Sequence, residues 1–228
     1  GMSTFVTMNC TRFDFPTALD IEINGVKFGK ISPKSERGVI KSLVIEGRIF
    51  KCYTGTYLET IEETIYIGIN EYDTYKKESK FNIYIQESNN NPKKILVEAT
   101  TNIGVKYLKK LAKAFPNRIS YTTISFDFRK IVTISDVGSL WFKDNDQNVN
   151  SKGYFGSDIE LNTDVDNAIT NDTATYVSVN MDVGGISRAL GFSKKGAIVV
   201  RNNIPGNAEG TQYLIAVCQI FQLLGVAN

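Results

Sequence analysis

Two segments of the chain carry apolar residues at helical spacing. Residues 102–115 and 207–224 place apolar side chains three and four positions apart, which predicts two amphipathic helices. A shift of 106 residues superposes Tyr107 on Tyr213, Leu108 on Leu214, Leu111 on Val217 and Phe115 on Phe221. This correspondence predicts an internal repeat.

Short strand-like segments precede each helix in a similar order. Residues 3–8, 64–69, 82–85 and 95–97 correspond to residues 122–127, 175–180, 189–192 and 198–200. The order predicts an α+β fold built from two tandem repeats, residues 2–118 and 119–228. Together they would form one curved antiparallel sheet, a saddle, with both helices on its convex face. Residues 30–60 and 143–172 are expected to be loops.

The other face of this sheet is expected to be bare, and therefore polar wherever it meets only water. In residues 175–182, the set Val177, Val179 and Met181 is the natural core face, and Tyr176, Ser178 and Asn180 form the opposite set. Phe192 directly precedes the predicted turn 193–196. We expect Phe192 to be exposed on the bare face; the ordinary alternative is a partly solvated sheet with aromatic residues at its edge.

Charge is distributed unevenly along the chain. The net charge is +2, but residues 1–118 hold 18 Lys/Arg against 13 Asp/Glu, and residues 119–228 hold 8 against 11. A surface that binds a polyanion must therefore be a local feature.

Several functional classes are disfavoured by composition. The absence of histidine excludes Ser-His-Asp catalysis and the usual histidine metal sites. The three cysteines are too scattered for a metal or redox motif, and the carboxylate pair Glu62–Glu63 lies in no recognisable motif. The sequence Asp144-Asn145-Asp146 lacks the glycine and glutamate of an EF-hand loop. We therefore expect no enzyme, no catalytic or metal site and no cofactor.

The expected compartment is intracellular and reducing, because free cysteines are sparse and odd in number. No apolar run reaches the roughly 18 residues of a membrane span, and no signal peptide is expected. The abundance of Asn, Ile, Lys and Tyr suggests an AT-rich genome, such as that of a large DNA virus or a microbe. Such an origin would place the protein in a nucleus, or in a viral factory in the host cytoplasm.

The second half resembles the TATA-box-binding protein family. The segment RALGFSKKGAIVVRNN (188–203) and the helix GTQYLIAVCQIFQLLGV (210–226) look like that family's strand–turn–strand–helix signature. Ala114-Phe115-Pro116 resembles the link between the family's two repeats. The likeness covers most of both halves as architecture, and its motifs lie in residues 175–225.

The resemblance implies a function and partners. Members of the family bind the minor groove with a concave sheet and kink the duplex with paired phenylalanines. The chain would then be a general transcription factor that binds and bends AT-rich promoter DNA to nucleate transcription initiation. Other initiation factors would be its protein partners, with no membrane and no small-molecule substrate.

The resemblance also implies which residues touch DNA. One wedge pair would be Tyr176 and Phe192, with Ile65 and Ile85 as the first-half counterparts. Further sheet contacts would come from Thr4, Thr123, Ser178, Asn180, Leu190 and Val199. Phosphate contacts would come from Arg188, Lys194, Lys195, Arg201, Lys93 and Lys94. The lysines of the first helix, Lys106, Lys109, Lys110 and Lys113, would contact protein partners.

One alternative function remains open. The same sheet can receive a protein segment, and the chain would then recruit transcription or replication partners without tight DNA binding. The near-neutral charge and the missing first-half phenylalanines favour this alternative. The two functions differ in whether Tyr176 and Phe192 lie together on an uncovered face flanked by basic side chains.

Overall fold

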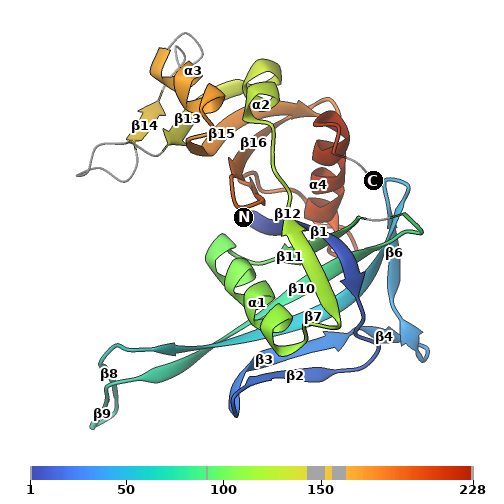
Figure 1. The fold of residues 1–228 in the computed structure, drawn as a ribbon, viewed down its shortest axis with the longest axis vertical. Coiled ribbons are helices and arrows are strands. Elements are labelled where there is room, and N and C mark those ends of the chain that lie inside the picture. The colour runs from blue at the N-terminus through green and yellow to red at the C-terminus, as the bar shows by residue number, and fades with distance from the viewer. Residues whose placement is uncertain (1, 91, 143–151, 156–162, 227–228) are drawn as a thin grey trace. The chain divides into compact units, whose positions relative to one another are not determined.

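The computed structural model describes residues 2–90, 92–142, 152–155 and 163–226. The fold is α+β, with a large antiparallel sheet and few helices (Figure 1). Two compact units divide the chain: unit 1 contains residues 1–8, 44–48 and 123–228, and unit 2 contains residues 9–43 and 49–122. Strand β1 (Ser3–Phe13) begins in unit 1 and ends in unit 2.

In unit 2 the strand order is β1, β11, β10, β7, β3, β2. The bounds of these strands are β2 Leu19–Ile23, β3 Val26–Pro33, β7 Arg48–Ile61, β10 Tyr75–Glu87 and β11 Lys93–Glu98. Strand β6 (Ser42–Ile45) pairs with β7, and β12 (Ile119–Thr123) pairs with β1. Two small hairpins complete the unit: β4 (Ser35–Glu36) with β5 (Val39–Ile40), and β8 (Ile65–Ile67) with β9 (Asn70–Tyr72).

Strand β7 shows why unit 2 has one covered and one open face. Tyr53, Gly55 and Tyr57 are buried, while Thr54 and Thr56 between them are half-exposed. Helix α1 (Thr101–Ala114) packs on the buried set: the ring of Tyr107 lies 4.9 Å from that of Phe81 and 6.4 Å from that of Tyr57. The hydroxyl of Tyr107 donates to the carbonyl of Lys30 at 2.9 Å, so this buried polar group has a partner.

In unit 1 the strand order is β14, β13, β15, β16, β17, β1. The bounds are β13 Asp136–Phe142, β14 Lys152–Phe155, β15 Ala174–Val183, β16 Ile186–Ser193 and β17 Ala197–Val200. The helices of this unit are α2 (Phe128–Ile134), α3 (Thr163–Thr170) and α4 (Gln212–Leu223). The apolar stripe of α4, Leu214, Val217, Ile220 and Phe221, is buried, as its spacing predicts.

Several predicted elements need correction. The second helix starts at Gln212 rather than 207, because Asn207 Oδ1 accepts the Thr211 N–H at 3.0 Å and Gly210 has a φ of +69°. Residues 30–60 are largely strand, and β7 is an interior strand of the sheet. Residues 64–69 belong to the separate β8–β9 hairpin. Among the described helices, none is long and apolar enough to cross a membrane.

Candidate functional site

The two members of the proposed wedge pair lie on opposite faces of the unit 1 sheet. Val177 is the register partner of Phe192, and Tyr176 is the partner of Ser193. Side chains of directly paired residues point to the same face, so Phe192 shares the core face with Val177. Phe192 is fully buried, and its ring lies 5.4 Å from that of Phe126. The expectation that Phe192 is exposed is therefore wrong.

Two other predicted DNA contacts lie on the same core face. Leu190 is fully buried, and Arg188 is half-buried opposite Met181. The Arg188 Nε is buried and has no hydrogen-bond partner among the described residues. Neither side chain is available to the open face of this sheet.

The opposite face of unit 1, which we call the Tyr176 face, contains Thr4, Asp136, Tyr176, Ser178, Asn180 and Val199. Tyr176 lies across Gly191, where an added Cβ would meet the phenol oxygen at 1.9 Å. The Arg201 guanidinium donates to the same oxygen. Ser178 and Ser139 are hydrogen-bonded through their hydroxyl oxygens at 2.6 Å. Most of these residues are half-exposed and Asn180 is exposed, so this part of the prediction does lie on an accessible surface.

The turn lysines of unit 1 differ in their surroundings. Both lysines are exposed, and Lys194 forms an ion pair with Asp172 at 3.1 Å. Thr123 is exposed at the end of β12, and its methyl group lies beside Gly196. Of the two lysines, Lys195 is therefore the more accessible to an anion.

The first-half residues of the predicted site do not come together. Ile65 is half-exposed in the β8–β9 hairpin, while Ile85 is buried in β10 opposite Ile95. Lys94 is only 3% exposed, and its Nζ donates to Asn9 Oδ1 at 2.6 Å. Lys93 is half-buried. The predicted wedge pair Ile65 and Ile85, and the phosphate contact at Lys94, are therefore wrong.

Unit 2 has an open face that the sequence analysis missed. In one cross-strand row, Thr56 stands between Lys30 and Lys80; in the next, Thr54 stands between Ser32 and Asn82. Lys34 donates to Asn82 Oδ1 at 2.6 Å. The two rows end at carboxylates, because Asp20 pairs with Lys30 and Glu98 pairs with Asn82. We call the part between them the basic face: Lys30, Ser32, Lys34, Thr54, Thr56, Lys80 and Asn82. Alternation of Tyr and Gly with Thr in residues 53–57 is the sequence signal that could have found it.

The lysines of α1 lie beside a groove on the other side of unit 2. Lys106 pairs with Glu59 at 3.6 Å, and the Lys110 ammonium lies 4.1 Å from the centre of the Phe28 ring. Both lysines line a cavity of about 400 Å³ with Val26 and Tyr57. Lys109 and Lys113 are exposed. Their assignment to protein contacts stays a prediction.

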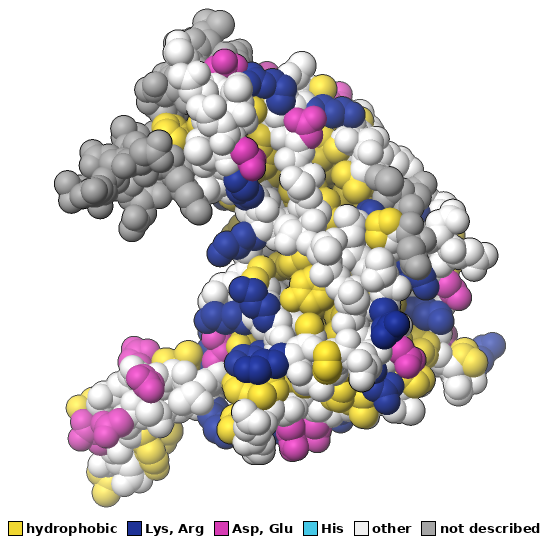
Figure 2. All heavy atoms as spheres, in the orientation of Figure 1, with side chains coloured by type: hydrophobic (Ala, Val, Ile, Leu, Met, Phe, Trp, Pro, Cys, Tyr) yellow, Lys and Arg dark blue, Asp and Glu magenta, His cyan; other side chains and the backbone are white. Residues whose placement is uncertain are grey.

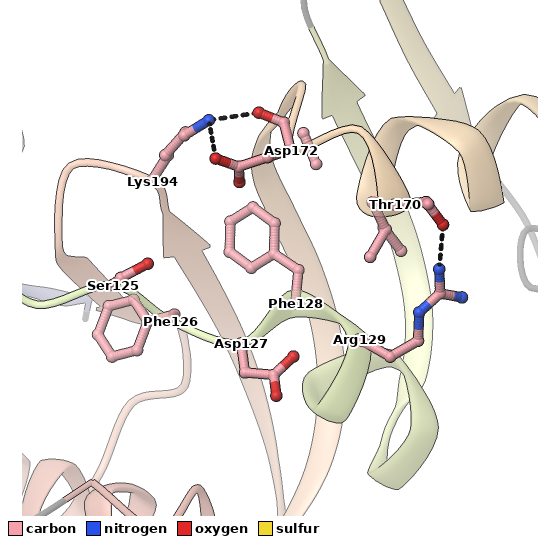
Figure 3. Close-up of a pocket in the computed structure, with 10 residues that line it drawn as sticks. Ser125, Phe126, Asp127, Phe128, Arg129, Thr170, Asp172 and Lys194 are labelled. Carbon is pink, nitrogen blue, oxygen red and sulfur yellow. Dashed lines mark hydrogen bonds and ion pairs between the residues drawn. The ribbon is translucent and has the colours of Figure 1, made fainter.

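A cavity of about 330 Å³ in unit 1 lies between the start of α2, the end of α3 and the turn after β16 (Figure 3). Arg129, at its rim, donates to Asp166 Oδ1 at 2.5 Å and to Thr170 Oγ1 at 2.9 Å. Lys194 faces Asp172 across the upper edge. Each cation is matched by a carboxylate, so this cavity offers a weaker anion site than the basic face.

The three cysteines are buried and free. Burial raises the pKa of the Cys10 and Cys218 thiols to about 11 and also raises the pKa of Cys52. A thiol that stays protonated is a poor nucleophile and a poor metal ligand. Within the described ranges, no three His, Cys, Asp or Glu side chains gather as a metal site would require. The Asp144–Asp146 segment lies outside the described residues.

Comparison with known proteins places the chain in no family. No protein-family model matches the sequence, and no curated protein matches it.

Proposed function

We propose that this chain binds double-stranded DNA through its open sheet faces, as a transcription initiation factor of the kind that its resemblance implies. The observation that carries the proposal is the basic face of unit 2. There, Lys30, Lys34 and Lys80 surround a patch of short hydroxyl and amide side chains. This face replaces the aromatic wedge as the main anchor of the proposed contact.

The chemistry of the basic face suits a polyanion with a polar groove. Lysine ammonium groups bind phosphate as point charges, and the release of counterions favours the complex at low salt. Ser32, Thr54, Thr56 and Asn82 are short, so a duplex can approach the backbone of the sheet closely. Hydroxyl and amide groups can donate to the acceptors that every base pair presents in the minor groove.

Strand register supports the tandem repeat that this proposal includes. In unit 2, Ile85 pairs with Ile95 and Ile83 with Val97; in unit 1, Phe192 pairs with Ile198 and Leu190 with Val200. These are the correspondences that the sequence alignment of residues 82–85 and 95–97 predicts. Continued to the next strand, the register makes β7, rather than residues 64–69, the counterpart of β15. A saddle built from two such repeats is part of the proposal.

The proposal has no kinking step at Phe192. A ring that is fully buried against Phe126 would have to leave the core before it could enter a base step. We therefore expect binding with little bending at this site, and affinity dominated by phosphate contacts.

The proposal is tested with a labelled AT-rich duplex, by fluorescence anisotropy at about 50 mM and about 200 mM salt. The double variant Lys30→Gln/Lys80→Gln should bind about tenfold more weakly at low salt, with a salt slope reduced by about 2. The matched control is Lys109→Gln/Lys113→Gln, which removes the same charge from α1. Equal losses in the two variants would show that binding is not directed by the basic face.

A second function, protein binding by the Tyr176 face, is favoured by a separate observation. Asp136 is paired in register with Asn180, and Asp182 with Ser187. These carboxylates repel phosphate but can accept hydrogen bonds from a protein segment. Wild-type protein that is folded yet does not bind DNA at low salt would overturn the DNA proposal and leave this function.

A further inference from the structure

The β8–β9 hairpin presents apolar side chains that its own chain does not cover. Ile69 is 101% exposed, Tyr66 72% and Ile67 62%. The hairpin lies at the far end of the ribbon formed by β7 and β10, beyond the pair Ile61 and Tyr75 (Figure 1). Isolated exposed apolar residues are common, but a cluster of them at the tip of a projecting arm marks an interaction site.

The same hairpin is acidic. Residues 62–73 contain Glu62, Glu63, Glu71 and Asp73, and no lysine or arginine. All of these carboxylates are on exposed residues. Figure 2 shows hydrophobic and acidic side chains on the arm. A partner surface should therefore be apolar at its centre and basic at its rim.

Unit 2 itself carries a surface with this character, the groove beside α1. Val26, Phe28 and Tyr57 supply apolar surface to the cavity of about 400 Å³. The lysines at its rim are Lys27, Lys76, Lys106 and Lys110. Glu59 is the acidic residue of the lining, and it pairs with Lys106. Figure 2 shows lysine and arginine side chains gathered around the position of α1.

We propose that the β8–β9 hairpin of one copy docks into the α1 groove of a second copy. The hairpin contributes Ile67 and Ile69 as apolar anchors, and its carboxylates face the groove lysines. Charge complementarity selects a second copy as the partner, because the acidic arm and the basic groove are both present on every chain. The inference does not depend on DNA binding.

The contact is heterologous, since two different surfaces meet. An open dimer leaves a free hairpin on one copy and a free groove on the other. Such contacts continue into a filament unless the geometry closes a ring, the smallest of which is a dimer that exchanges both hairpins. The chain should therefore associate into a closed dimer or a larger assembly as protein concentration rises.

Two variants each disrupt one of the docking surfaces, the first the hairpin and the second the groove. Ile69→Lys replaces a fully exposed anchor with a charge that the groove lysines repel. Lys110→Glu gives the groove a charge that the hairpin carboxylates repel. Neither residue is part of the buried core, so both variants should keep the wild-type far-ultraviolet circular dichroism spectrum. The matched control is Ile186→Lys, at a 52% exposed isoleucine in unit 1.

The experiment is size-exclusion chromatography with light scattering over a wide concentration range, without DNA. Wild type and Ile186→Lys should form dimers or larger oligomers, and each docking variant alone should stay monomeric. An equal mixture of the two docking variants should form a capped 1:1 dimer, because one supplies the hairpin and the other the groove. A monomeric wild type, a monomeric mixture, or continued oligomerisation of either variant would overturn the proposal.

Discussion

The open faces of the two units use the same strand register but place their charged side chains differently. In unit 2, a row runs Asp20, Lys30, Thr56, Lys80, while the corresponding positions of unit 1 include Asp182 and Ser187. The neighbouring row reads Ser32, Thr54, Asn82, Glu98 in unit 2 and Asp136, Asn180, Ala189 in unit 1. The backbone pairing is therefore shared, and the side chains decide which face attracts a phosphate backbone.

The two repeats therefore need not contribute equally to one function. The basic face presents three lysines between the carboxylates of Asp20 and Glu98. The Tyr176 face presents Asp136, with Asp182 further along the same strand row, and Arg201, whose guanidinium donates to the Tyr176 hydroxyl. In the proposed DNA binding, the lysines of unit 2 provide most of the electrostatic attraction. Unit 1 is then left to orient the DNA or to bind a protein.

The largest expected effect separates the two faces of unit 1 itself. Phe192→Ala removes a fully buried ring, so we expect it to lower the free energy of unfolding by about 3–5 kcal/mol. Tyr176→Ala, on the half-exposed face, should cost about 1 kcal/mol or less. Urea unfolding followed by circular dichroism measures both values. Similar losses in the two variants would contradict the assignment of the two residues to different faces.

A glycine in each unit tests how tightly a ring is held. A Cβ at Gly55 would lie 2.4 Å from Phe81 in the packed core of unit 2, so Gly55→Ala should cost about 1–3 kcal/mol. A Cβ at Gly191 would meet the end of the Tyr176 side chain, which can swing toward solvent. We expect Gly191→Ala to cost about 1 kcal/mol or less. Thermal unfolding of the two variants gives the order, and a larger loss at Gly191 would show that Tyr176 is fixed in place.

Charge reversal should make unit 1 behave like unit 2. Asp136→Lys/Asp182→Lys places two cations on the Tyr176 face, where we expect an AT-rich duplex to bind about tenfold more tightly at low salt. The anisotropy assay used for the basic face measures this change, and its salt slope should steepen by about 2. No change in affinity would indicate that DNA does not reach the Tyr176 face.

The smallest expected effect is one that the two units should share. Burial raises the pKa of Cys10 in unit 2 and of Cys218 in unit 1 to about 11. Above a pH of about 9, the unfolded thiols ionise while the folded ones stay protonated, so stability is complete below this pH and falls above it. Each thiol should lower the free energy of unfolding by about 1 kcal/mol for every pH unit between about pH 9 and about pH 11.

Unfolding midpoints measured from neutral pH to about pH 10.5 would show this slope. Cys10→Ala and Cys218→Ala should each flatten it by a similar amount. If neither variant changes the slope, the loss of stability at alkaline pH comes from other groups. One such group is Tyr53, whose pKa burial raises to about 12.

Local periodicity predicts part of this fold well. Helix α1 lies at Thr101–Ala114, within a residue of the predicted segment, because its apolar stripe is regular and faces a single layer. The alternating residues 175–182 also divide as predicted: Val177, Val179 and Met181 are buried. In such segments one periodic signal is enough to identify both the element and its covered face.

The side of the sheet on which Phe192 lies could not be predicted from β16 alone. Leu190, Gly191 and Phe192 are all buried, so this strand lacks the alternation of apolar and polar residues that would indicate its covered face. Its face is decided by the pairing of Val177 with Phe192, which is a long-range property of the register. The basic face was missed for a similar reason, because its lysines come from strands far apart in sequence.

The pairing of β1 with β17 has a consequence for synthesis on the ribosome. Ser3–Val6 pair with Ala197–Val200, and the Thr7 N–H and hydroxyl both donate to the Gly196 carbonyl, at 2.9 and 2.6 Å. Residues 3–6 are synthesised long before residues 197–200, so they must wait for these partners, and closing so long a loop is slow. The core of unit 2, within residues 9–122, can form earlier. Unit 1 should therefore complete its sheet only after β17 has been synthesised, and the edge of β1 that faces β17 stays unpaired until then.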